Sequence, residues 1–109
     1  MAANSSSKNS SEFLREIQKL EVRLNDFLKE EEALIEKLKK FIEKLRDTGD
    51  KIKLKNKPEE LAALRLEIVQ ALNEVLKSEG EVQHERSHLL ESYGALILAL
   101  EEEFKRKIS

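Results

Sequence analysis

The sequence predicts an all-α fold: a long antiparallel helical hairpin (a coiled coil) that oligomerisation or a partner completes into a helical bundle. Apolar residues recur at seven-residue intervals in both halves of the chain, which is the repeat of packed amphipathic helices. Charged residues make up 39% of the 109 residues and aromatic residues 5%, a composition typical of long helices. At this length the chain forms one domain at most.

The first predicted helix covers about residues 12–47. Its heptad positions d, a and e are mostly apolar, with Glu31 as the single polar residue at an a position, so the stripe is wide enough for two or more neighbouring helices. The d series is Phe13, Leu20, Phe27, Leu34 and Phe41; the a series is Ile17, Leu24, Leu38 and Leu45; the e series is Leu14, Leu28, Ile35 and Ile42. Ser11 is the predicted N-cap, and residues 1–11 are predicted to form a disordered tail because they are rich in Ser and Asn and lack periodicity.

A connector over residues 48–57 is predicted to end the first helix, because Gly49 can adopt the left-handed conformation found after a last helical turn. The second helix is predicted over about residues 58–107, with Pro58 in its first turn. Its d series is Leu61, Ile68, Val75, Val82, Leu89 and Leu96. This series passes Gly80 and Gly94 without a change of phase, which favours one helix over the alternative of a third helix starting near Gly80.

Joining the two helices across this connector predicts an apolar overhang at the C-terminal end. Residue 47 then faces residue 58, Glu12 lies beside Tyr93, and the apolar run 94–100 extends beyond the first helix. An isolated apolar tip of this kind indicates a binding surface. The residues predicted to contact a partner are Leu89, Tyr93, Leu96, Ile97, Leu98, Leu100, Phe104, Phe13, Ile17 and Leu20. We therefore expect a homo-oligomer or a complex with a helical partner protein.

Residues 84–88 match the H-E-x-x-H pattern, in which two histidines bind zinc and the glutamate acts as general base. In the predicted heptad register His84 and His88 lie opposite the apolar stripe and point to water, and no third ligand follows at a suitable spacing. We therefore predict that the protein is not an enzyme and uses no cofactor. His84 and His88 remain the candidate metal ligands, and a zinc metallopeptidase is the remote alternative.

The charge distribution argues against nucleic acid and membrane as partners. The net charge is −2, which provides no general attraction to either. Residues 37–57 are locally basic, so the alternative to a solvated face is docking of this region on phosphate or anionic lipid. The absence of cysteine, of a signal peptide and of an apolar run near 20 residues predicts an intracellular protein, cytoplasmic or nuclear and not secreted.

These observations predict a structural or interaction protein of the coiled-coil class. The Lys/Glu-rich stripe from Glu31 to Leu90, including Arg86 and Leu89, resembles flagellar export chaperones in composition. That resemblance implies the alternative function, a helical-hairpin chaperone or adaptor that shields an amphipathic segment of a client protein. A designed bundle is a third alternative, disfavoured by the two glycines inside the second helix and by its irregular a series.

Overall fold

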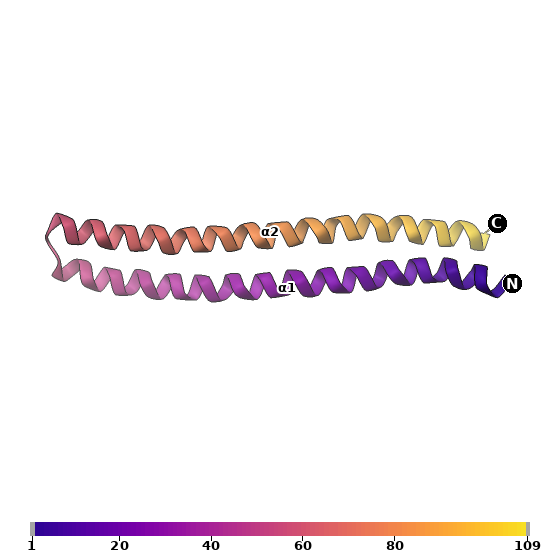
Figure 1. Ribbon diagram of the computed structural model, residues 1–109, viewed down its shortest axis with the longest axis horizontal. Helices are drawn as coiled ribbons and strands as arrows, with labels where there is room; N and C mark the ends of the chain where they lie inside the picture. The colour runs from indigo at the N-terminus through magenta and orange to yellow at the C-terminus, as the bar shows by residue number, and fades with distance from the viewer. Residues whose placement is uncertain (1, 109) are drawn as a thin grey trace. The chain divides into compact units, whose positions relative to one another are not determined.

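The computed structural model describes residues 12–108 in full, and that part of the chain forms two helices joined by a short connector. The helices are α1 (Ala2–Leu54) and α2 (Pro58–Ile108) (Figure 1). The predicted all-α helical hairpin is therefore confirmed, and residues 12–108 contain no strand. The predicted tail over residues 1–11, with its N-cap Ser11, lies outside the residues described in full.

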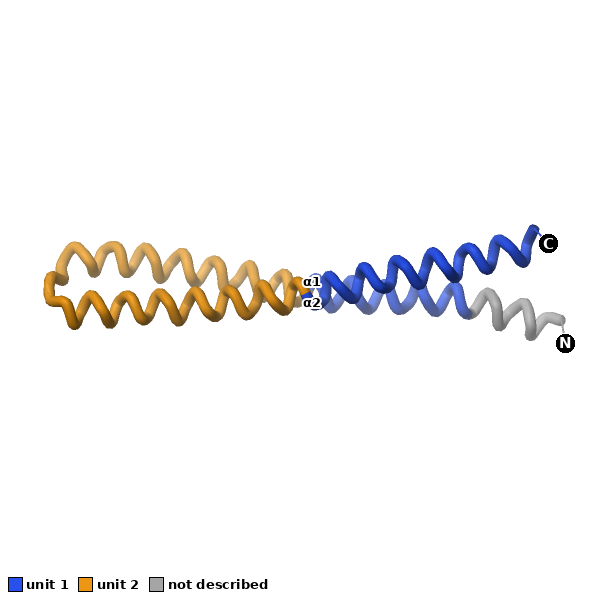
Figure 2. The backbone as a smooth tube through the Cα atoms, turned by 90° about the horizontal axis from the view of Figure 1, so that it is seen from above, with its two compact units in different colours: residues 1–28, 84–109 blue, residues 29–83 orange. Residues whose placement is uncertain are grey.

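The chain divides into two compact units (Figure 2). Unit 1 contains Met1–Leu28 and His84–Ser109, and unit 2 contains residues 29–83. Each unit pairs one segment of α1 with an antiparallel segment of α2. A lone helix cannot bury its own apolar stripe, so in each unit the second segment provides the surface that the first requires.

The connector is confined to residues 55–57, so the predicted loop over 48–57 is wrong. α1 passes through Gly49 without a positive φ and ends at Leu54. One glycine costs about 1 kcal/mol in a helix interior. That cost does not end the helix here, because pairing with α2 continues beyond residue 47 and buries Thr48.

The second helix begins at Pro58, as predicted, and continues through Gly80 and Gly94 as a single helix. The amide nitrogen of Leu61 donates to the carbonyl oxygen of Lys57 at 3.1 Å, which closes the first turn. Proline is favourable at this point because a first-turn residue has no helical partner for its missing N–H. The alternative of a third helix starting near Gly80 is therefore wrong.

Replacing Gly49 with alanine tests the path of the chain at the end of α1. A β-carbon added at Gly49 meets nothing within 4 Å, and the backbone is helical. We expect Gly49→Ala to raise the free energy of unfolding by about 1 kcal/mol, because alanine has the higher helix propensity. Urea unfolding followed by circular dichroism measures this change. A loss of stability would instead indicate the left-handed residue that the sequence predicted.

The longer α1 shifts the pairing between the helices by about seven residues relative to the prediction. In unit 2, Lys37 Nζ lies 3.7 Å from a carboxylate oxygen of Glu74. The predicted register paired Lys37 with residue 68. Lys44 Nζ lies 3.7 Å from a carboxylate oxygen of Glu67, whereas the predicted register paired Lys44 with residue 61. In unit 1 the guanidinium of Arg86 lies 5.4 Å from the ring centroid of Phe27.

This register removes the predicted overhang after Tyr93. Ser92 is buried, and Ala95, Leu96, Ala99 and Leu100 are half-buried, so most of the apolar run already packs within unit 1. The prediction failed because it placed the end of α1 seven residues too early, at residue 47 in place of Leu54.

The helices meet at heptad positions d and g, whereas the sequence predicted d, a and e. Position g lies three residues after d and on the opposite flank from a and e. On α1 the d residues are Phe13, Leu20, Phe27, Leu34, Phe41 and Thr48, all buried or half-buried. On α2 the covered d residues are Ile68, Val75, Val82, Leu89 and Leu96, and the covered g residues are Leu64, Ala71, Ser78, Glu85, Ser92 and Ala99.

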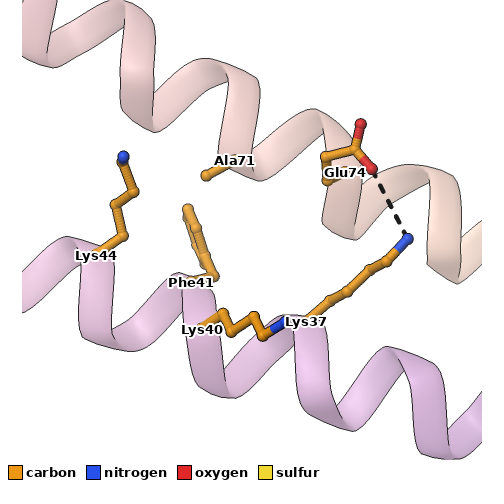
Figure 3. Close-up of a pocket in the computed structure, with 6 residues that line it drawn as sticks. All are labelled: Lys37, Lys40, Phe41, Lys44, Ala71 and Glu74. Atoms are coloured by element: carbon orange, nitrogen blue, oxygen red, sulfur yellow. Dashed lines mark ion pairs between the residues drawn. The ribbon is translucent and has the colours of Figure 1, made fainter.

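Small side chains at g of α2 explain this choice of flank. In unit 2 the ring of Phe41 points toward Ala71 (Figure 3). One heptad away in the same unit, Leu34 lies opposite Ser78, and both are buried. Small residues let two helix backbones approach closely enough for the large d residues of α1 to pack against α2.

Candidate interaction surface

α1 leaves a second apolar stripe uncovered. Positions a and e of this helix alternate at three- and four-residue spacing, which is the spacing of a coiled-coil seam. The exposed large apolar residues on this α1 strip are Leu14, Leu24, Leu28, Ile35, Ile42, Leu45 and Ile52. Each e position on α1 from residue 14 to residue 49 is exposed, whereas the a positions Ile17, Glu31 and Leu38 are half-buried, so α2 covers this side of α1 only in part.

α2 carries its own uncovered strip, at positions e and b. Its members, again at four- and three-residue spacing, are Ala62, Leu66, Val69, Asn73, Leu76, Gly80, Gln83, Ser87, Leu90, Gly94 and Ile97. All of them are exposed. None carries a charge, although 39% of the chain is charged. The sequence alone contained this signal, because eleven consecutive seam-spaced positions without a charge are unusual on a solvated helix face.

The two glycines of α2 lie on this α2 strip. A β-carbon added at Gly80 or Gly94 meets nothing within 4 Å. Each glycine nevertheless costs about 1 kcal/mol in a helix interior. A glycine on a helix face leaves room for a neighbouring helix to approach closely.

In each unit the α1 strip and the α2 strip lie on the same side of the helix pair. On each helix, an observer looking along the chain from its N-terminus finds the strip turned in the same direction from the d/g contact. Because both helices are right-handed and run antiparallel, equal senses of rotation bring both strips to one side. We call this side the apolar face. In unit 2 it includes an open groove lined by Ala62, Arg65, Leu66 and Val69.

The opposite side of unit 2 is polar. A groove there is lined by Lys37, Lys40, Phe41, Lys44, Ala71 and Glu74 (Figure 3). The ion pairs Lys37–Glu74 and Lys44–Glu67 join α1 to α2 along this side. These two lysines of the basic region therefore have carboxylate partners.

The ten residues predicted to bind a partner fall into two groups. Leu89 is buried between the helices, and Phe13, Ile17, Leu20, Leu96 and Leu100 are half-buried. Tyr93, Ile97, Leu98 and Phe104 are exposed. Tyr93, Ile97 and Phe104 occupy a and e positions on the apolar face, whereas Leu98, at position f, lies outside the α2 strip. Sequence reasoning missed the part of the α2 strip before Leu89.

The predicted metal ligands lie close together on unit 1. His84 is exposed, but the side chain of His88 is only 27% exposed, so the prediction that both point to water is wrong for His88. Position c, which His88 occupies, lies beside the covered g flank, and this explains its burial. The Nε2 atoms of the two rings are 3.1 Å apart, with the ring planes at 84°. A carboxylate oxygen of Glu85 lies within 4.8 Å of both histidines' ligand nitrogens.

Comparison with protein-family models, curated proteins and solved structures gave no match to this chain. Among the described residues, neither helix has a stretch that is both apolar enough and long enough to cross a membrane. The assignment of function therefore depends on the apolar face and on the residues that form it.

Proposed function

We propose that the chain is a non-enzymatic helical interaction protein that pairs with a second copy of itself through the apolar face. The observation that carries this proposal is the presence of two uncovered seam-spaced strips on one side of each helix pair. In the pairing that we propose, the α1 strip of one copy packs on the α2 strip of the other. We thus keep the homo-oligomer that the sequence predicted, but we place the interface between copies on the apolar face and not on a C-terminal overhang.

The two strips have complementary sizes. The α1 strip consists mainly of Leu and Ile, and the α2 strip contains Ala, Ser and two glycines among its larger residues. Large side chains of one helix need space between the residues of the next, and the small residues of α2 provide it. In a two-fold symmetric dimer, the α1 strip of each copy packs on the α2 strip of the other, so the same contact occurs twice. One chain therefore carries both surfaces that an isologous interface needs. Four antiparallel helices then enclose a common core, as in a four-helix bundle.

The magnitudes support association. Seven residues of the α1 strip and five of the α2 strip are large, apolar and about half exposed (the five are Leu66, Val69, Leu76, Leu90 and Ile97). Covering the exposed half of each is worth about 1 kcal/mol. Two copies together gain on the order of 20 kcal/mol, against an association cost of about 4–15 kcal/mol. A net gain of about 5–16 kcal/mol remains, which favours association of two copies.

Size-exclusion chromatography with light scattering tests the proposal on the full chain. We expect a mass of twice 12.6 kDa at micromolar concentration. A monomer across the micromolar range contradicts self-pairing. In that case the chaperone alternative makes its own prediction: an added amphipathic client helix should raise the midpoint of thermal unfolding of the monomer.

A further inference from the structure

A second site lies on unit 1, on the side of α2 away from the apolar face. His84, Glu85 and His88 occupy positions f, g and c, which point away from the e and b positions of the α2 strip. Two nitrogens bonded at about 2.0–2.1 Å to one tetrahedral or octahedral ion lie about 2.9–3.4 Å apart. The observed 3.1 Å between the two Nε2 atoms falls within this interval.

A buried carboxylate oxygen of Glu85 without a hydrogen-bond partner lies beside the two histidines. Among the residues described in full, the buried side-chain atoms without a hydrogen-bond partner are Glu85 Oε2 and His88 Nδ1. A buried polar atom without a partner calls for an explanation, and an ion bound by the Glu85 carboxylate is one. The carboxylate of Glu91 lies 3.7 Å from His88 Nδ1. A carboxylate at that nitrogen orients the ring of a metal-binding histidine and leaves Nε2 free to bind the ion.

We propose that His84, His88 and Glu85 form a binding site for a divalent transition-metal ion such as Zn²⁺. The two Nε2 atoms ligate the ion directly, and the Glu85 carboxylate supplies the third donor after a side-chain rotation. The Glu91 carboxylate, 3.7 Å from His88 Nδ1, approaches this nitrogen on metal binding and then accepts its N–H. Imidazole and carboxylate ligands suit zinc, and three protein ligands leave a position for water. The inference concerns binding only and does not depend on dimerisation.

Isothermal titration of the full chain with ZnCl₂ near neutral pH tests the site. The chain has two histidines and no cysteine, so binding by histidine is assigned without ambiguity. We expect one Zn²⁺ per chain. His84→Ala and His88→Ala should each lower the affinity on the order of 100-fold, and Glu91→Gln about 10-fold, because loss of an outer partner typically costs 10–100-fold. Glu85→Gln should also lower the affinity, because it removes the third donor.

These variants are expected to fold, because His84 is exposed and alanine has a higher helix propensity than histidine. Far-ultraviolet circular dichroism without metal checks their helix content. Glu102→Gln, at an exposed carboxylate three turns or more from the cluster, is the matched control and should bind zinc as the unmodified chain does. The proposal is overturned if the unmodified chain does not bind zinc, or if both histidine variants bind it as tightly as the unmodified chain does. A hydrogen bond between the two imidazoles would then explain why their Nε2 atoms lie 3.1 Å apart.

Discussion

The double variant Leu76→Lys and Leu90→Lys is expected to convert the dimer into a monomer. Both residues lie at e positions of the α2 strip and are 57% and 62% exposed in the single chain. Association as proposed would remove them from water, and a lysine ammonium buried without a partner is strongly unfavourable. We expect the dissociation constant to rise by about 100-fold or more, measured by sedimentation equilibrium over a range of concentrations.

Leu98→Lys provides the matched control for this experiment. Leu98 is 65% exposed on the same helix of unit 1, but it occupies position f and lies outside the α2 strip. Leucine and lysine have similar helix propensities, so neither change should unfold the helices of the single chain. If Leu98→Lys dissociates the dimer as strongly as the double variant does, the surface between copies is not the apolar face.

Ser78→Leu is expected to lower the free energy of unfolding by about 1–3 kcal/mol. Ser78 is 2% exposed at a g position of α2, opposite the buried Leu34 in unit 2. A leucine there adds volume at a place where the two helices pack closely, and overpacking forces side chains out of favourable rotamers or separates the helices. Urea unfolding followed by circular dichroism at one fixed protein concentration measures the change.

Gln70→Leu is the control for this substitution, because Gln70 is an exposed f position on α2 in the same unit. It should change stability by less than about 0.5 kcal/mol, as surface substitutions usually do. In the register that the sequence predicted, position g faces water, and Ser78→Leu would then be neutral or slightly stabilising. Equal effects of the two substitutions would support that register and contradict the d/g contact.

The candidate sites were only partly predictable from the sequence. Tyr93, Ile97 and Phe104, which are exposed, were predicted to bind a partner because of an overhang, and the shift of about seven residues in the pairing removes that overhang. The proximity of His84 and His88 follows from their four-residue spacing on a helix. The partial burial of the His88 side chain does not follow from that spacing. It depends on which flank of α2 packs against α1.

The sequence by itself determined that this protein is two helices folded against each other, that the second begins at Pro58, and that it continues through Gly80 and Gly94. Seven-residue periodicity and a first-turn proline are local signals, and the backbone hydrogen bonds of a helix are local as well. Only the tertiary structure decided where α1 ends and which flank of the d series is covered. Both depend on the fit of side-chain volumes between helices, where Ala71 and Ser78 admit the large residues of α1 and leave the Leu and Ile residues of the α1 strip exposed.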